Sequence, residues 1–272
     1  MSTFRELHRP GDPFILANVW DIGTARMLAA LGARALATSS AALAFTLGRP
    51  DMGNLTRDES LAHAESIVAA TPLPVQGDFE NGFGHDPDTC AETVRLAGEI
   101  GLAGLCIEDM ALPAKQAYDR AHAVERVRAA AAAARALSKD MVFFARADGI
   151  MNGSYDLSEA IIRIQAFEAA GADGVYVPVP GTAEDLRRIC QAVSIPVNVL
   201  AVAPFDRMTR AELGGLGVAR ISLGSALARA THRLFHDAAL AIFDNGDFSL
   251  LTRSIRGDKI DALLERGGCN EP

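Results

Sequence analysis

Short runs of apolar and β-branched residues recur along the chain at intervals of roughly 30 residues, the length of one strand–helix unit. These runs are apolar throughout instead of alternating with polar residues, as expected of strands that are covered on both faces. Eight of them are predicted to be strands: Phe14–Val19, Arg34–Thr38, Pro74–Asp78, Gly104–Glu108, Met141–Arg146, Gly174–Pro178, Pro196–Leu200 and Arg220–Leu223.

The segments between these runs carry signals for the start and the end of helices. Thr56 and Glu59 have the spacing of a capping box, and Asp86 is followed by Pro87 at the first helical position. Gly32 stands where a helix is expected to end before the next strand. The chain is therefore predicted to alternate strand and helix eight times.

This alternation favours an α/β fold in which parallel strands close into a (β/α)8 TIM barrel. An open doubly wound sheet is the main competitor, but no G-x-G-x-x-G turn follows the first strand and the sequence has no Walker A loop. We expect a single domain over residues 1–272, with the barrel over about residues 12–243. Residues 244–272 are predicted to form an extra helical tail that packs on a neighbouring subunit.

Composition and charge narrow the class of protein. With 272 residues, 49% of them hydrophobic, the chain can bury a large core. A net charge of −8 disfavours binding to nucleic acids or to anionic membranes, and neither a signal-peptide pattern nor an apolar run of membrane-spanning length is present. The cysteines form no CxxC pair, so we expect reduced thiols in a cytoplasmic protein: Cys90, Cys106, Cys190 and Cys269.

Carboxylates collect at the C-terminal ends of the predicted strands, where barrel enzymes carry out their chemistry. Asp78 and Glu80 are two positions apart and are predicted to point the same way, while Glu108 ends the neighbouring strand. Asp51 lies in the loop after the second strand. Crowded carboxylates repel one another unless a cation neutralises them, and all-oxygen donors suit Mg²⁺, or Mn²⁺, better than zinc. The pattern predicts a metal site, although a lone carboxylate at a strand end is more often a helix cap.

Arg146 ends the fifth predicted strand and is the cation best suited to bind a substrate carboxylate through two hydrogen bonds. Ser39 and Ser40 follow the second strand, and their backbone N–H groups can donate to an oxyanion. The alternative is that Arg146 is a structural partner of the carboxylates. Asp148 is interpreted as a residue that holds a loop in place.

These motifs resemble the isocitrate lyase/phosphoenolpyruvate mutase superfamily over nearly the whole chain. The run from Gln76 to Gly84 is similar to the family's D-A-D-x-G-[FY]-G signature. This resemblance implies that Asp78 ligates Mg²⁺ directly and that Glu80 does so through water. The strand that ends at Glu108 is similar to the G-x-x-I-E-D element, which implies that Glu108 completes the metal shell.

The resemblance also implies roles in substrate binding. The A-R-A-D run with Arg146 is similar to the family's A-R-[TV]-[DE] element, in which the arginine holds the substrate carboxylate. Ser39, Ser40 and Ala41 fall where family members bind the oxo-acid end of the substrate. Asp51 matches a further acid near the metal.

The chain departs from the family where the type of reaction is decided. The lyases carry K-[KR]-C-G-H after the fourth strand, whereas residues 111–120 contain neither Cys nor His, which argues against a typical isocitrate or methylisocitrate lyase. The polar loop pattern of the mutases is also missing, so Lys115 and Tyr118 are the remaining candidates for acid/base work. Val179 stands where the lyases have a substrate-binding Glu, and Asn198 is a candidate substrate contact two positions from their Asn.

The nearest match is to the short superfamily members named after carboxyphosphonoenolpyruvate mutase. The resemblance implies an Mg²⁺-dependent enzyme that acts on a small 2-oxo acid or related carboxylate through an enolate, as a C–C lyase or decarboxylase. A phosphoenolpyruvate- or phosphonopyruvate-type P–C mutase or hydrolase, and a non-catalytic 2-oxo acid binding protein, stay open. The resemblance further implies a homo-oligomer, a dimer or tetramer, in which the last barrel helix is exchanged between partners.

Overall fold

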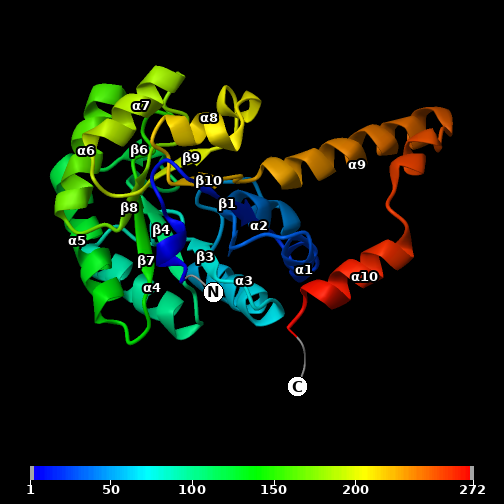
Figure 1. Ribbon diagram of the computed structural model, residues 1–272, viewed down its shortest axis with the longest axis horizontal. Helices are drawn as coiled ribbons and strands as arrows, with labels where there is room; N and C mark the ends of the chain where they lie inside the picture. The colour runs from blue at the N-terminus through cyan, green and yellow to red at the C-terminus, as the bar shows by residue number, and fades with distance from the viewer. Residues whose placement is uncertain (1–2, 270–272) are drawn as a thin grey trace.

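The computed structural model describes residues 3–269, and its eight long-range strands close into a parallel barrel (Figure 1). Around the barrel the strand order is β1-β10-β9-β8-β7-β4-β3-β2. These strands are β1 Phe14–Asn18, β2 Leu36–Ala37, β3 Val75–Asp78, β4 Gly104–Glu108, β7 Val142–Arg146, β8 Gly174–Tyr176, β9 Val197–Leu200 and β10 Arg220–Ser222. The predicted (β/α)8 barrel is confirmed, and each predicted strand contains an observed one.

Helices follow the strands and cover most of the outside of the barrel (Figure 1). They are α1 Ile22–Ala30, α2 Ser40–Thr46, α3 Arg57–Ala70, α4 Pro87–Glu99, α5 Arg120–Ala136, α6 Leu157–Ala169, α7 Ala183–Ala192, α8 Arg210–Gly215, α9 Ala226–Asn245 and α10 Gly257–Gly267. Thr56 and Glu59 form the predicted capping box of α3, and Asp21 caps α1. Within residues 3–269, no helix is both long and apolar enough to cross a lipid bilayer.

Short elements complete the chain. The 3₁₀ helices are η1 Arg5–Leu7, η2 Phe205–Arg207 and η3 Ser249–Arg253. After β4 the chain forms an antiparallel hairpin of two short strands, β5 Met110–Ala111 and β6 Gln116–Ala117. This hairpin contains the loop at residues 111–120 in which acid/base groups were expected.

The base of the barrel is closed by the residues that precede β1. The rings of Phe4 and His8 pack edge-on against Phe14, with centroids 6.2 and 4.9 Å away, and all three side chains are buried. Inside the barrel, the guanidinium carbon of Arg220 lies 3.5 Å from the ring centroid of Phe144. Residues before the predicted barrel start near residue 12 therefore belong to its packing.

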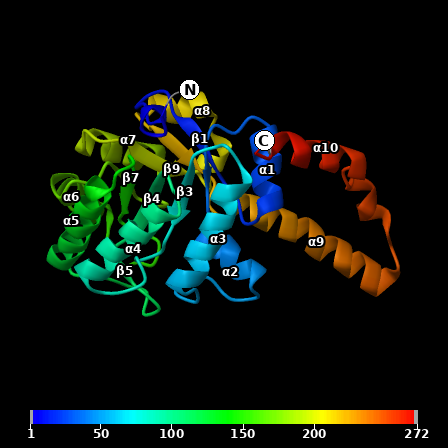
Figure 2. The same cartoon turned by 90° about the horizontal axis from the view of Figure 1, so that it is seen from below.

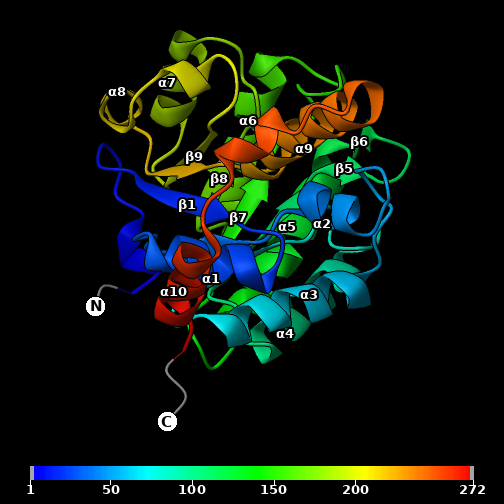
Figure 3. The same ribbon diagram turned by 90° about the vertical axis from the view of Figure 1, so that its right-hand side faces the viewer.

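The last two helices leave the barrel. From the end of β10, α9 runs outward, and α10 returns to lie against α1 (Figures 2 and 3). Because α9 points away, it does not cover β1, and Ile15 in that strand is 46% exposed. The part that leaves the barrel begins at Ala226, whereas the tail was predicted from residue 244.

The contact between α10 and α1 depends on a close backbone approach. A Cβ atom at Gly267 would lie 1.8 Å from the carbonyl oxygen of Arg26, whereas a Cβ at Gly257 would meet nothing within 4 Å. We expect Gly267→Ala to push α10 away from α1 and to speed hydrogen exchange of the α10 amides by about tenfold or more. Gly257→Ala, on the same helix, is the matched control and should not speed exchange. Unchanged exchange in Gly267→Ala would contradict this packing.

Candidate active site

A cavity of about 340 Å³ lies at the C-terminal ends of the barrel strands. It is lined by all the predicted site residues except Lys115 and Tyr118: Ser39, Ser40, Ala41, Asp51, Asp78, Glu80, Glu108, Arg146 and Asn198. The strand order explains the convergence, because β3, β4 and β7 are neighbours and end in Asp78, Glu108 and Arg146. The fold therefore brings side chains together that are far apart in sequence.

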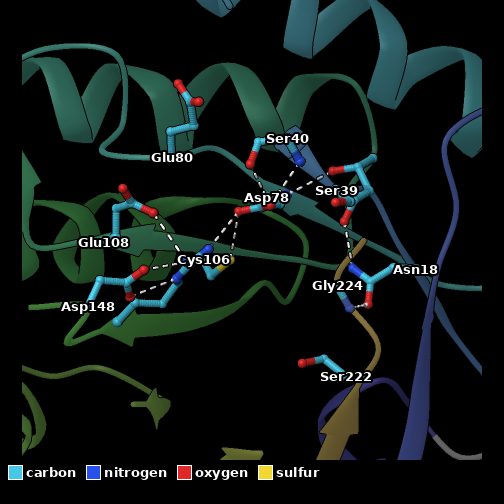
Figure 4. A network of polar contacts seen from close by, with 12 residues as sticks. Asn18, Ser39, Ser40, Asp78, Glu80, Cys106, Glu108, Asp148, Ser222 and Gly224 are labelled. Atoms are coloured by element: carbon cyan, nitrogen blue, oxygen red, sulfur yellow. Dashed lines mark hydrogen bonds and ion pairs between the residues drawn. The ribbon is translucent and has the colours of Figure 1, made fainter. Parts of the chain in front are cut away.

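Asp78 is held on both carboxylate oxygens (Figure 4). Its Oδ2 accepts from the backbone N–H and the hydroxyl of Ser40, both at 2.9 Å. Its Oδ1 accepts from Nη1 of Arg146 at 2.9 Å and lies 3.6 Å from the Cys106 thiol. These contacts fix the Asp78 carboxylate in a single orientation toward the cavity.

Arg146 is the electrostatic centre of the site. Besides the contact with Asp78, its Nη2 lies 3.2 Å from Oε2 of Glu108, and its Nε donates to Oδ1 of Asp148 at 3.0 Å. Burial by itself would lower the pKa of Arg146, but the three carboxylates raise this pKa well above its usual range. In this structure Arg146 pairs with carboxylates, which is the alternative that the sequence left open.

Burial makes it costly for three acids of the cavity to be ionised: Asp51, Glu80 and Glu108. Burial raises the pKa of Glu80 to about 7, and the charges of Asp78 and Asp51 act in the same direction. Burial also raises the pKa of Asp51, and it raises the pKa of Glu108 well above the usual range, with Asp148 contributing. Glu80 accepts a hydrogen bond from the N–H of Gly53 and stands apart from Asp78 and Glu108 (Figure 4). The prediction that Asp78 and Glu80 point the same way is wrong, because β3 ends at Asp78 and Glu80 has a φ of +43°.

The acids supply the kind of donors that a divalent cation needs. Among residues 3–269, no three His, Cys, Asp or Glu side chains lie close enough together to hold a metal ion as they stand. However, Asp51, Asp78, Glu80 and Glu108 line one cavity, offer only oxygen atoms, and three of them have raised pKa values. A hard cation such as Mg²⁺ would relieve that excess negative charge. The donor set therefore fits the predicted metal.

A second network fixes the wall beside Asp78 (Figure 4). Asn18 of β1 donates from Nδ2 to the carbonyl oxygen of Thr38 at 2.8 Å, and its Oδ1 accepts from the N–H groups of Leu223 and Gly224. The hydroxyl of Thr38 accepts from the N–H of Asp78 at 2.8 Å. The ends of β1, β2, β3 and β10 are thus tied into one frame around the cavity.

The two candidates for acid/base work lie outside the cavity wall. The Tyr118 hydroxyl forms a hydrogen bond of 2.8 Å with Nδ1 of His85 and accepts another, of 3.2 Å, from Nδ2 of Asn81. Lys115 occupies the turn of the β5–β6 hairpin with a φ of +58°, near enough for its charge to oppose the rise in the pKa of Asp51. The conformation of the loop decides where Lys115 and Tyr118 lie. The spacing of residues in the sequence does not reveal that conformation.

Asn198 lines the cavity but its amide is engaged in the barrel wall. Its Nδ2 donates to the Ser222 hydroxyl at 2.8 Å, and its Oδ1 accepts from Nε of Arg220 at 2.8 Å. Direct contact with a substrate would require it to exchange one of these partners.

Three further side chains belong to the site although the sequence did not assign them to it. Cys106 was predicted only to be a reduced thiol, and its Sγ lies 3.6 Å from Oδ1 of Asp78. Asp148 was expected to hold a loop in place, and its backbone N–H donates a hydrogen bond to Oδ1 of Asp109. Its carboxylate also accepts a hydrogen bond from Nε of Arg146. Tyr176 lines the cavity, with its ring centroid 5.2 Å from the Arg146 guanidinium carbon. Strand alternation could have found Cys106, because it is two positions from Glu108.

The chain is similar to known proteins over most of its length. The phosphoenolpyruvate phosphomutase family model matches residues 4–243. A crystal structure described as a lyase or mutase from Burkholderia cenocepacia J2315 is 44% identical, with a TM-score of 0.91 over 96% of this chain and 93% of that one. The oxaloacetate decarboxylase of Pseudomonas savastanoi pv. phaseolicola is 30% identical over 79% of this chain and 75% of its own length. The 2,3-dimethylmalate lyase of Eubacterium barkeri is 29% identical over 79% and 76%.

The raised pKa of Glu80 makes stability depend on pH. The pKa rises from 4.5 to about 7 on folding, so ionising Glu80 weakens the fold as the pH increases through this range. Relative to the parent, we expect Glu80→Gln to gain about 1–3 kcal/mol in free energy of unfolding between pH 4.5 and pH 8. Urea unfolding at several pH values, with a chelator present, measures this, and the exposed Glu65→Gln is the control. A difference that does not change with pH would refute it.

Proposed function

Because the chain belongs to the phosphoenolpyruvate phosphomutase family of the isocitrate lyase/phosphoenolpyruvate mutase superfamily, we propose that it is an Mg²⁺-dependent C–C lyase or decarboxylase. Its substrate would be a small 2-oxo acid or a related carboxylate. The observation that carries this proposal is the convergence of Asp78, Glu108 and Arg146 on one cavity. Relatives that are named as an oxaloacetate decarboxylase and as a 2,3-dimethylmalate lyase support it.

The acids would hold the cation, and Arg146 would bind the substrate. Asp78 and Glu108 are the direct ligands in this proposal, with Glu80 and Asp51 around them. Bound Mg²⁺ supplies Lewis-acid stabilisation of the negative charge that develops on the 2-oxo oxygen when a bond at the next carbon breaks. With two of its carboxylates so engaged, Arg146 would keep Asp148 as a partner and offer its other N–H groups to the substrate carboxylate.

The cavity also contains a hydroxyl that can carry a proton. Tyr176 lines the cavity beside Arg146. A phenol is protonated near neutral pH, and burial raises the pKa of Tyr176 further. Lys115 and Tyr118, the candidates from the sequence, do not line the cavity. In this proposal Tyr176 replaces them as the proton donor to the carbon that is left after cleavage.

Asp78→Asn tests the metal-dependent mechanism. The variant keeps the size of the side chain but removes a charged ligand, so we expect loss of tight Mg²⁺ binding and a fall in kcat/KM on the order of 10³-fold. Calorimetry and turnover of a panel of 2-oxo acids measure the two effects. Asp86→Asn is a matched control, because Asp86 is exposed and its side chain makes no cap bond to α4. Full turnover of Asp78→Asn in the presence of a chelator would rule the mechanism out.

The same panel distinguishes the other candidate functions. Release of phosphate and pyruvate from phosphonopyruvate would indicate the P–C hydrolase, and conversion to phosphoenolpyruvate would indicate the mutase. Tight binding of 2-oxo acids without turnover of any of them would indicate a binding protein.

We also propose that the protein is a homo-oligomer in which α9 of one subunit covers the barrel of another. Among its exposed apolar residues, Phe235 and Phe243 on α9 are 75% and 84% exposed, and Ile15 on β1 lacks a covering helix. The exposed side chains of Phe235, Phe243 and Ile15 are apolar, and α9 projects away from the barrel after β10 (Figures 1 and 2). A second copy of the chain supplies the helix that fits there.

A charge placed on this helix tests the assembly. We expect Phe235→Glu to convert an oligomer into monomers, since burying an unpaired carboxylate in an apolar interface is costly. Ile162→Glu, on the exposed side of α6 away from α9, is the control and should keep the parental mass. Light scattering after size exclusion measures the mass. A parent chain that is monomeric at micromolar concentration contradicts the assembly.

A further inference from the structure

The cavity does not stop at the acids but continues downward into the barrel. Four of the residues that line it stand two positions before the last residue of their strand: Leu16 in β1, Gln76 in β3, Cys106 in β4 and Arg220 in β10. Side chains two positions apart point to the same face of a strand, so these four lie one layer below the side chains at the strand ends. We call them the floor of the cavity.

The floor is more polar than the interior of a barrel usually is. Interior layers of this kind are filled mainly by branched apolar side chains. Here Arg220 and Gln76 are almost completely buried, and Nη1 of Arg220 donates to Oε1 of Gln76. Two polar side chains in contact thus occupy positions that packing alone would give to apolar ones.

Arg220 is a buried cation whose partners are all neutral. Its Nε donates to Oδ1 of Asn198 at 2.8 Å, and its guanidinium carbon lies 3.5 Å from the ring centroid of Phe144. Its Nη1 lies 3.4 Å from Nε2 of His8, and burial lowers the pKa of His8 to about 3, so this ring is neutral. Within residues 3–269 no carboxylate forms an ion pair with Arg220.

The two arginines of the cavity therefore differ in their electrostatic surroundings. Burial acts to lower the pKa of Arg146, but three carboxylates raise it well above its usual range. Burial lowers the pKa of Arg220 to about 9, and the positive charge of Arg146 acts in the same direction. A buried charge without a counter-ion is costly. An anion in the floor would supply that counter-ion and would also reduce the repulsion between the two guanidinium groups.

Two N–H donors in the floor lack an acceptor. Among residues 3–269, neither Nη2 of Arg220 nor Nε2 of Gln76 forms a hydrogen bond. Neither atom belongs to the fully covered side-chain atoms that lack a partner, so both are still accessible. Because both residues are nearly buried and both line the cavity, the cavity is the space from which these donors can be reached.

The charge and the donors of the floor match a carboxylate. One positive charge balances one negative charge, and two neighbouring N–H donors suit a group with two acceptor oxygens. We propose that the floor binds a carboxylate through Arg220 and Gln76, and that this is the second carboxylate of a 2-oxo dicarboxylate substrate. The inference rests on the proposed function, which places the 2-oxo acid head among the acids above the floor.

A substrate of this class contains a group that can leave from C3. When the second carboxylate is attached to C3, the C3–C4 bond breaks and this carboxylate departs as CO₂. When it is attached to a hydroxylated C4, the same bond breaks, and the C4 hydroxyl gives up its proton and becomes the carbonyl of a leaving oxo acid. In both reactions the bonding electrons stay on C3 as the enolate, which then takes up a proton.

Binding of matched ligands tests the inference without turnover. Oxalate, 2-oxoglutarate and 5-methyl-2-oxohexanoate are titrated by calorimetry into the full chain with Mg²⁺ present. The last two share the same head and chain and differ in a carboxylate or an isopropyl end. We expect 2-oxoglutarate to bind at least about tenfold more tightly than the isopropyl compound, because a buried charge-assisted hydrogen bond stabilises the complex more than an apolar contact does there.

Variants then locate the effect. Gln76→Glu keeps the shape of the side chain and gives Arg220 a permanent counter-ion, so it should fold and should repel an incoming carboxylate. We expect it to abolish the preference for 2-oxoglutarate and to leave oxalate binding unchanged. Arg229→Gln is the matched control, because it changes the net charge by the same amount at an exposed residue that also lines the cavity. It should keep the preference.

Acetate distinguishes a substrate end from a free anion. In the parent chain, acetate should bind beside oxalate and should be excluded by 2-oxoglutarate, whereas Gln76→Glu should not bind it. Acetate that binds beside oxalate while 2-oxoglutarate shows no preference would assign the floor to a free anion and overturn its role in substrate binding.

The outcomes separate this inference from the proposed function. If oxalate does not bind, the site for the oxo-acid head is wrong and both proposals fall. If oxalate binds but 2-oxoglutarate binds no more tightly than its isopropyl counterpart, the inference is overturned while the proposed function stands. The same holds if Arg229→Gln, and not Gln76→Glu, removes the preference, since the second carboxylate then binds at the mouth of the cavity.

Discussion

The ion pairs of Arg146 are the interaction on which the rest of the site depends. One guanidinium contacts the carboxylates of Asp78, Glu108 and Asp148, which are almost entirely withdrawn from water. Without a positive charge among them, three buried carboxylates at this spacing would repel one another and take up protons. Arg146 therefore lowers the cost of holding these acids close together, although burial still raises the pKa values of Glu108 and Asp148. A cation bound by the same acids would share that task, which links metal binding to the freedom of Arg146.

The barrel makes this arrangement possible because its strands are parallel and adjacent. Side chains at the ends of β3, β4 and β7 are neighbours, although Asp78 and Arg146 are separated by 68 residues along the chain. A second frame around Asn18 ties β1 and β2 to the loop after β10. The base of the barrel is closed, and there the guanidinium of Arg220 stacks on the ring of Phe144. Ligands therefore enter the barrel from the C-terminal ends of its strands.

The helix that leaves the barrel has a different consequence. Because α9 projects outward, β1 is left with an exposed Ile15, while α9 itself exposes Phe235 and Phe243. α9 also carries Arg229 to the mouth of the cavity. The exposed surface of α9 therefore lies next to the cavity, and a partner that covered α9 would lie close to the candidate active site.

The sequence by itself determined the barrel and the acid cluster, because both follow from local pattern and strand order. Apolar runs of strand length, spaced by helices, define the eight strands, and residues such as Asp78 and Glu108 come at the ends of those runs. Tertiary structure alone decided that Arg146 pairs with the acids and that Tyr118 turns toward His85. It also decided that α9 leaves the barrel. Long side chains and loops choose among many conformations of similar energy, and contacts with residues distant in the sequence make that choice.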